Sequence, residues 1–187
     1  MQTGLDTFLA ERLPELAGRR VGLITNPTGV DCRLRSSVDL LRASGALELV
    51  ALFGPEHGVR GEAQAGVPVS GAIDRHTGLP VHSLYGETRR PTPAMLAGLD
   101  ALIFDLQDVG ARYATYVSTL AYAQEAAAQA GLRFVIFDRP NPITGTHIEG
   151  NLLDPAFASF VGVHPLPVRH GLTVGELAHL FAAECGW

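Results

Sequence analysis

A short loop at residues 53–61, with the sequence F-G-P-E-H-G-V-R-G, carries three ionisable side chains between glycines and a proline. It follows the apolar run E-L-V-A-L-F, which is typical of a buried strand. Glu56 comes directly after this run, where partial burial would raise the pKa of its carboxyl and suit it to donate a proton. His57 and Arg60 are placed to tune Glu56 or to bind a substrate. The simpler alternative is that Glu56 accepts hydrogen bonds from the backbone N–H groups of the following glycines.

Apolar, strand-like runs alternate with helical patterns along the rest of the chain. Strands are predicted at residues 19–25, 47–53, 78–86, 100–110 and 132–140, and a late extended segment with two prolines, better suited to a sheet edge, at 164–171. Helices are predicted at residues 34–45, 92–99, 114–131 and 172–184, and the first 18 residues also show a helical pattern. Thr92 is expected to cap the second of these four helices, and Thr173 with Glu176 fits a capping box. The alternation predicts an α/β fold with a mostly parallel sheet buried on both faces.

Five of the extended segments end in polar residues. These ends read T-N-P-T-G, G-P-E-H-G, D-L-Q-D-V-G-A-R-Y, D-R-P-N-P-I-T-G and R-H-G-L-T. Because ligands of open parallel sheets bind beyond the carboxyl ends of the strands, we expect these residues to share one rim. Two long Gly/Pro-rich connections, at 54–78 and 139–163, are of the kind that is functional or mobile.

Several kinds of chemistry lack their motif. No G-x-G-x-x-G follows the first strand, there is no G-x-S-x-G elbow, and there is no P-loop. All 14 basic residues are arginine, so Schiff-base lysine chemistry is excluded. Carboxylate chemistry remains, and glycoside hydrolysis commonly uses one carboxyl group as the acid and a second group as nucleophile or base. The carboxylates expected at or near the rim are Glu56, Glu62, Glu87, Asp105, Asp108, Asp138 and Glu149.

The two aspartates of the strand at 100–110 are interpreted differently. Asp105 lies within the strand, and we expect a buried carboxylate that pairs with an arginine or caps a loop. Asp108 lies at or beyond the strand end and is equally suited to catalysis or to a structural role. A metal site built from His57, Asp108 and His170 is conceivable, but no metal-binding motif supports it and none is predicted.

Further residues could contact a ligand. Arg112, Tyr113 and Tyr116 begin the helix at 114–131 or directly precede it, where arginine can bind carboxylates and aromatic rings can stack on sugar faces. Alternatively, Tyr116 packs in the core and Arg112 pairs with Asp108. The remaining candidates are Asp138, Arg139, Asn141 and His170. The first three fit a rigid turn better than a ligand contact, and a single histidine such as His170 is more often a hydrogen-bonded structural residue.

Composition restricts the partners. The 187 residues carry a net charge of −5 with no basic cluster, so nucleic acid is not expected to bind. Cys32 and Cys185 form no CxxC motif and are interpreted as ordinary thiols. There is no apolar run of membrane-spanning length and no signal-peptide pattern, so we expect no membrane contact and a cytoplasmic location, or a secreted or periplasmic one if a leader has been removed. The oligomeric state is not predicted.

Seven segments together resemble one known family, the DUF1343 or NamZ-type exo-β-N-acetylmuramidases of the bacterial YbbC-like group. In family order they are G-L-I-T-N-P-T-G-V-D (22–31), F-G-P-E-H-G-V-R-G (53–61), S-L-Y-G (83–86), F-D-L-Q-D-V-G-A-R-Y-A-T-Y (104–116), F-D-R-P-N-P-I-T-G (137–145), E-G-N-L-L (149–153) and P-V-R-H-G-L-T-V-G-E (167–176). The resemblance implies that residues 1–187 are a Rossmann-like, three-layer N-terminal catalytic domain. The smaller C-terminal domain of the family is expected to be absent from this chain.

The resemblance also implies an activity. It implies release of N-acetylmuramic acid from the non-reducing end of peptidoglycan fragments, with the glutamate of G-P-E-H-G, here Glu56, as general acid/base. Charge complementarity, rather than the resemblance, suggests the hypothesis that Arg60 or Arg112 meets the lactyl carboxylate of muramic acid. No cofactor is implied, and either an enzyme nucleophile or the substrate's 2-acetamido group could assist.

These considerations lead to one set of candidate site residues. The candidates for catalysis are Glu56, His57 and Asp108. The candidates for binding a peptidoglycan-derived sugar or muropeptide are Asn26, Arg60, Glu62, Arg112, Tyr113, Tyr116, Asp138, Arg139, Asn141, Glu149 and His170. Two alternatives remain, a non-catalytic sugar-binding module on the same rim and an unrelated α/β hydrolase with a metal.

Overall fold

The computed structural model describes residues 2–61, 63–64, 66–68 and 71–187. Within these residues a six-stranded sheet has the order β3-β4-β2-β1-β5-β6, and all its pairs are parallel except β3 with β4. The bounds are β1 Arg20–Thr25, β2 Glu48–Gly54, β3 Ala72–Ile73, β4 Pro80–Ser83, β5 Ala101–Asp105 and β6 Arg133–Ile136. This sheet confirms the predicted α/β fold, which is Rossmann-like.

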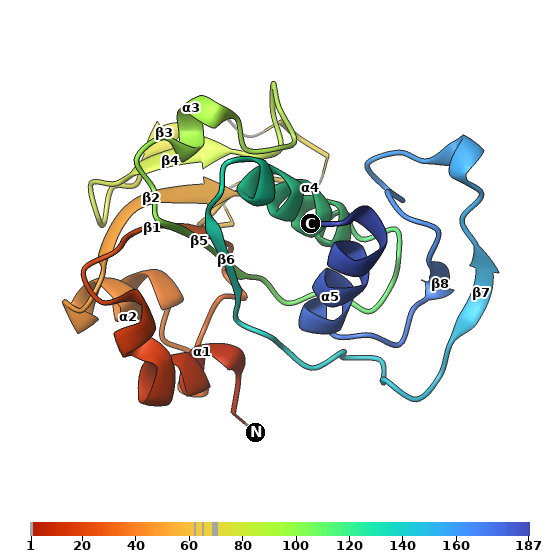
Figure 1. Cartoon of the computed structure of the whole chain (residues 1–187), viewed down its shortest axis with the longest axis horizontal. Helices are drawn as coiled ribbons and strands as arrows, with labels where there is room; N and C mark the ends of the chain where they lie inside the picture. The colour runs from red at the N-terminus through yellow and green to blue at the C-terminus, as the bar shows by residue number, and fades with distance from the viewer. Residues whose placement is uncertain (1, 62, 65, 69–70) are drawn as a thin grey trace.

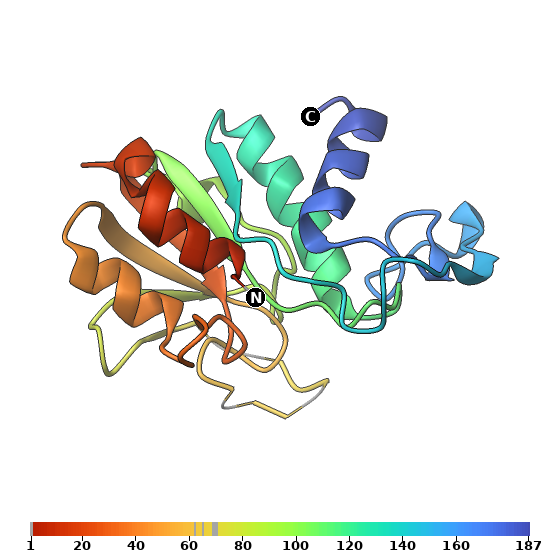
Figure 2. The ribbon, with the colours of Figure 1, turned by 90° about the horizontal axis from the view of Figure 1, so that it is seen from below.

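Helices cover both faces of the sheet (Figures 1 and 2). One face is covered by the N-terminal helical segment and by α2, and the other by α3, α4 and α5. The bounds are α1 Gly4–Thr7, a π-helical turn Phe8–Arg12, a 3-10 turn Leu13–Leu16, α2 Ser37–Ser44, α3 Pro93–Leu96, α4 Thr115–Gln129 and α5 Val174–Cys185. Thr92 caps α3, and Thr173 with Glu176 forms the capping box of α5, as predicted.

The hydrophobic core lies in two layers, one on each side of the sheet. Residues of β1 and β5 alternate between the layers, because successive side chains of a strand point to opposite faces. Ile24 and Phe104 pack towards α4 and α5, whereas Leu23 and Ile103 pack towards the N-terminal segment and α2. Strands buried on both faces are typical of parallel sheets, and all five residues of β5 are buried.

A second, two-stranded sheet lies apart from the main one. It pairs β7, Glu149–Leu152, with β8, Pro167–Arg169, in antiparallel fashion, and a 3-10 turn at Pro155–Phe157 lies between them. We call residues 140–169 the arm, since they project from the side of the molecule next to α5 (Figures 1 and 2). The segment at 164–171 is extended as predicted, but it pairs with β7 and not with the main sheet.

Large apolar side chains are exposed along the arm. Ile148, Leu152, Phe157 and Val161 are 57–75% exposed, and all four residues of β7 are exposed. Phe160 differs from its neighbours, because only 7% of it is exposed. No helix in the described part of the chain is both long enough and apolar enough to cross a membrane.

Candidate active site

The carboxyl ends of β4, β2, β1, β5 and β6 lie side by side, so four of the five polar segment ends share one rim as predicted. The fifth, R-H-G-L-T, follows β8 of the separate two-stranded sheet, and its place in that rim was wrongly predicted. Following the chain, strands are added to the sheet on both sides of β1. On one side lie β2 and β4, and on the other side lie β5 and β6. The order therefore reverses between β1 and β5, which is where ligands bind in open α/β sheets. Asn26 follows β1 at this point, and Gln107 lies shortly after β5.

Glu56 lies at the start of a tight loop after β2, in which the N–H of Gly58 donates to the carbonyl of Pro55. His57 has a φ of 74° and Gly58 a φ of 77°. The left-handed conformation is ordinary for glycine and strained for histidine. These turns aim the Glu56 side chain towards the N-terminus of α4.

Two donors hold the Glu56 carboxylate. The Thr115 hydroxyl donates to Oε2 over 2.6 Å, and the N–H of Gly66 donates to Oε1 over 2.8 Å. Burial alone raises the pKa of Glu56, but hydrogen bonds from Thr115, Gly66 and Tyr85 outweigh it, so the pKa lies below its usual value. Burial acts in the predicted direction, but the expected net rise of this pKa is wrong, because the hydrogen bonds lower it further than burial raises it. A glycine N–H does donate to Glu56, but it belongs to Gly66, whereas Gly58 and Gly61 of the 53–61 loop donate to backbone carbonyls.

Tyr85 and His57 complete the surroundings of Glu56. Burial and the neighbouring Glu56 carboxylate raise the pKa of the Tyr85 phenol. His57 Nδ1 lies 3.1 Å from the carbonyl oxygen of Ala63. The imidazole therefore bridges the loop, and its charge when protonated also lowers the pKa of Glu56.

Asn26 and Tyr116 form a directed chain of hydrogen bonds beside Glu56. The Asn26 side-chain oxygen accepts from the N–H and the hydroxyl of Thr28, so its amide nitrogen donates to the Tyr116 hydroxyl over 2.9 Å. Burial raises the pKa of Tyr116, and the Glu56 carboxylate adds to the shift. The N–H of Gln107 donates to Thr28 Oγ1, which links the ends of β1 and β5.

Arg60 and Arg112 are both engaged within the protein. Arg60 donates to both oxygens of Asp74, over 3.0 and 2.9 Å. Arg112 Nη1 donates to the carbonyls of Asn151 and Leu166 in the arm, and not to Asp108 as the alternative reading proposed. Tyr113 is 62% exposed, and Glu62 lies outside the described residues.

Asp108 and His170 lie together, buried between the end of β5 and the end of β8. Asp108 Oδ2 accepts from the N–H of Gly110 and lies 3.3 Å from His170 Nε2, and His170 Nδ1 accepts from the N–H of Leu172. His170 is 1% and Asp108 5% exposed. Among the described residues no group of three or more histidine, cysteine and acidic side chains could hold a metal ion.

Four further candidates make structural contacts. Arg139 is 6% exposed and forms a buried ion pair with Asp105, which confirms the structural interpretation of Asp105 and places Arg139 in the interior. Asp138 accepts from the Thr173 hydroxyl and the N–H of Gly175 at the start of α5. Asn141 donates to the carbonyl of Leu172, and Glu149 pairs with Arg169 on the outside of the arm.

The structure thus groups part of the predicted set around Glu56. Asn26, His57 and Tyr116 are near it, whereas the buried Arg139 pairs with Asp105, and the buried Asp108 and His170 lie against each other. Sequence reasoning did not select Thr115 or Tyr85, although both lie in segments quoted for the family resemblance.

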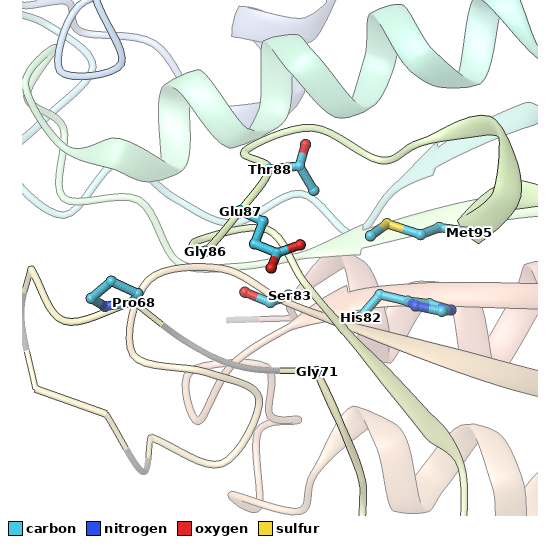
Figure 3. A pocket seen from close by; sticks show the side chains of 8 residues that line it. All are labelled: Pro68, Gly71, His82, Ser83, Gly86, Glu87, Thr88 and Met95. Carbon is cyan, nitrogen blue, oxygen red and sulfur yellow. The ribbon is translucent and has the colours of Figure 1, made fainter.

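A pocket of about 350 Å³ lies on the β4 side of the rim (Figure 3). Figure 3 shows His82 and Ser83 from β4 facing it, with Glu87 and Thr88 from the following turn and Met95 from α3. Glu56 does not line it, but Pro68 does, two residues after the glycine that binds Glu56. The pocket is therefore a neighbour of the carboxylate and not its own cavity.

The fold and rim define a class: a Rossmann-like domain that presents a hydrogen-bonded carboxylate beside phenol and amide groups. Residues 21–187 match the family model described as "Exo-beta-N-acetylmuramidase NamZ, N-terminal", and the chain belongs to this family. It is 57% identical over 184 residues to the peptidoglycan β-N-acetylmuramidase NamZ of Bacillus subtilis, covering 98% of this chain and 44% of that protein.

Two solved structures of DUF1343 family proteins from Bacteroides fragilis have the same fold. One has a TM-score of 0.92 at 49% identity and the other a TM-score of 0.84 at 35% identity. The chain is covered to 98% in both and spans 46% and 47% of those chains. It therefore corresponds to about half the length of the relatives that it matches.

Proposed function

We propose that this chain supplies the catalytic carboxyl group of an exo-β-N-acetylmuramidase, which releases N-acetylmuramic acid from the non-reducing end of peptidoglycan fragments. The observation that carries the proposal is the placement of Glu56. Its carboxylate lies at the carboxyl end of β2, oriented by Thr115 and Gly66 and flanked by Tyr85 and Tyr116. The Bacillus subtilis relative is a peptidoglycan β-N-acetylmuramidase, and this supports the substrate class.

Glu56 acts as general acid/base in this proposal. It protonates the glycosidic oxygen while a nucleophile, either an enzyme group or the substrate's 2-acetamido oxygen, bonds to the anomeric carbon. As a carboxylate it then takes a proton from the water that displaces this nucleophile. The acid step needs a protonated carboxyl, whereas the hydrogen bonds of the free domain favour the carboxylate. A bound sugar excludes water from Glu56 and strengthens the effect of burial, which raises the pKa towards the value that the acid step needs.

The test is release of N-acetylmuramic acid, or of p-nitrophenol from its β-glycoside. We would assay this chain and its fusion to the part of the Bacillus subtilis relative that it does not match. Glu56→Gln is expected to lower turnover by about 10² to 10⁴-fold, the usual contribution of a general acid. The matched control is Glu48→Gln at the opposite end of the same strand, where Glu48 pairs with Arg20 at the surface, and it should leave turnover unchanged.

A non-catalytic module for muropeptides is the second candidate, because a carboxylate with a lowered pKa is a good acceptor for sugar hydroxyls. Binding measured by calorimetry separates the two. Lost turnover with retained sugar binding in Glu56→Gln supports catalysis. A folded wild-type fusion that binds the sugar but releases nothing would refute the enzymatic proposal and favour the module.

A further inference from the structure

Arg89 lies on a tight turn directly after β4, between the rim and the arm. The Thr88 hydroxyl fixes this turn, because it donates to the carbonyl of Arg90 over 2.8 Å and accepts from the N–H of Arg90. The N–H of Gly86 donates to the carbonyl of Thr88. The backbone that carries Arg89 is therefore held by its own short-range hydrogen bonds.

Aromatic rings support the guanidinium of Arg89. Its central carbon lies 4.6 Å from the ring centre of Phe160 and 5.4 Å from that of Tyr85. These rings belong to a row that runs from Tyr85 through Phe160 to Tyr122, with centres 5.9 and 5.8 Å apart. Stacking on ring faces orients a guanidinium while leaving the N–H donors at its edge available.

Arg89 differs in charge pairing from the other arginines near the rim. Arg60 pairs with Asp74, Arg169 pairs with Glu149, and Arg112 donates to two carbonyls. The neighbouring Arg90 also lies over a ring, that of Tyr122, but it pairs with Glu125 over 2.7 Å. Within the described residues Arg89 has no carboxylate partner and is exposed.

The ring of Tyr85 connects Arg89 to the catalytic carboxylate. One face of the ring lies under the Arg89 guanidinium, and the hydroxyl is near enough to hydrogen-bond Glu56. A positive group thus lies one phenol ring away from the carboxyl group that would protonate the glycosidic oxygen. An acidic substituent that extended from a sugar at Glu56 across Tyr85 would meet an opposite charge at Arg89.

We propose that Arg89, oriented by Tyr85 and Phe160, forms a carboxylate-binding subsite that receives the lactyl group of N-acetylmuramic acid. This inference rests on the proposed function. It replaces Arg60 and Arg112 in the role expected for them, because both are engaged inside the protein. The subsite selects a sugar with a carboxylate over the otherwise similar N-acetylglucosamine, which lacks the lactyl group.

The test compares the affinity of this chain for N-acetylmuramic acid with that for its lactyl amide, which keeps the shape and loses the charge. The wild type should prefer the acid about tenfold, as expected for a charge-assisted hydrogen bond. Arg89→Gln should reduce this preference to near onefold. Arg89→Lys should keep part of it, because lysine retains the charge but not the planar fork.

Arg90→Gln is the matched control, since it removes the adjacent stacked arginine and should leave the preference unchanged. An unchanged preference in Arg89→Gln, an equal loss in Arg90→Gln, or a wild type without any preference would overturn the subsite. Release of N-acetylmuramic acid by the fusion protein tests the proposed function separately. If the fusion protein releases N-acetylmuramic acid but the preference for the acid does not depend on Arg89, only the subsite is refuted. If the preference depends on Arg89 but the fusion protein releases no sugar, only the catalytic role is refuted.

Discussion

The ionisation of Glu56 depends on a balance between burial and hydrogen bonding. Burial is the largest single influence and favours the protonated form, but Thr115, Gly66 and Tyr85 together favour the carboxylate. The donors come from α4, from the loop after β2 and from the turn after β4, so three separate elements set the charge of one side chain. Removing one donor should therefore shift the pKa measurably.

Thr115→Val should raise the pKa of Glu56, because valine keeps the shape of threonine but cannot donate to Oε2. The measurement is an NMR titration of the glutamate carboxyl carbons. Thr119→Val is the control, since Thr119 donates to the carbonyl of Thr115 one turn further along α4 and not to Glu56. A Glu56 pKa that stays the same or falls in Thr115→Val would show that this hydrogen bond does not stabilise the carboxylate.

The position of Glu56 could be predicted from the sequence, but its pKa could not. A charged residue directly after an apolar run must lie at the end of a strand, and the direction of parallel strands then places it on the rim. Its donors Thr115 and Gly66 are 59 and 10 residues away, and nothing in the local pattern indicates them. The same limitation affected Arg139, which looked like a loop residue and is the buried partner of Asp105, 34 residues away.

At the scale of the elements, an ion pair between described residues joins the two ends of the connection between β2 and β4. Arg60, near its start, donates to both oxygens of Asp74, which also accepts from the N–H and hydroxyl of Thr77. The Asp74 side chain is 4% exposed and that of Arg60 31%. The guanidinium of Arg60, with smaller contributions from Thr77, holds the pKa of Asp74 well below its usual value.

A carboxyl whose pKa is depressed on folding stabilises the protein above its unfolded pKa, about 3.9 for aspartate, and this stabilisation is lost as the pH falls. Asp74→Asn should therefore lower the free energy of unfolding at pH 7 and make it depend less on pH below about pH 5. Urea denaturation at pH 7 and at about pH 3.5 measures both effects. The control Asp39→Asn changes an exposed carboxylate of α2. If Asp74→Asn lowered the free energy of unfolding by the same amount at both pH values, the prediction would be contradicted.

Elements with a clear hydrophobic period were predicted, and elements without one were not. The strands β1, β2, β5 and β6 are apolar runs, and α4 and α5 have helical spacing, so each was expected near its observed place. In contrast, β3 has two residues and β7 has no buried residue. Strands of this kind form because a partner strand is nearby, and the partner cannot be predicted from the local sequence.

At the scale of the whole molecule, several groups of contacts anchor the arm to the domain. Leu166 belongs to the core beside α4 and α5, and His164 contacts Glu184 and Phe181 of α5. Phe160 packs against Tyr85 and Tyr122, and Arg112 binds two carbonyls of the arm. A two-stranded sheet is only marginally stable by itself in water. The order of the arm therefore depends on these anchors.

Phe160→Ala should loosen the arm without unfolding the main sheet, because it removes the buried ring between Tyr85 and Tyr122 while Leu166 stays in the core. Hydrogen exchange should become faster at the amides of β7 and β8 and stay unchanged in β1 and β5. Val161→Ala, at the adjacent exposed position, should have little effect. Equal acceleration throughout the chain would instead mean that Phe160 supports the global fold.

The position of Tyr85 has a thermodynamic consequence, because this ring contacts both Phe160 of the arm and, through its hydroxyl, the Glu56 carboxylate. Two equilibria that share one residue are coupled, and the coupling free energy is the same in both directions. If docking of the arm keeps Tyr85 in place, it weakens the binding of a proton to Glu56. Proton binding to Glu56 must then weaken arm docking by the same factor, so that acid loosens the arm and a firmly docked arm keeps Glu56 ionised.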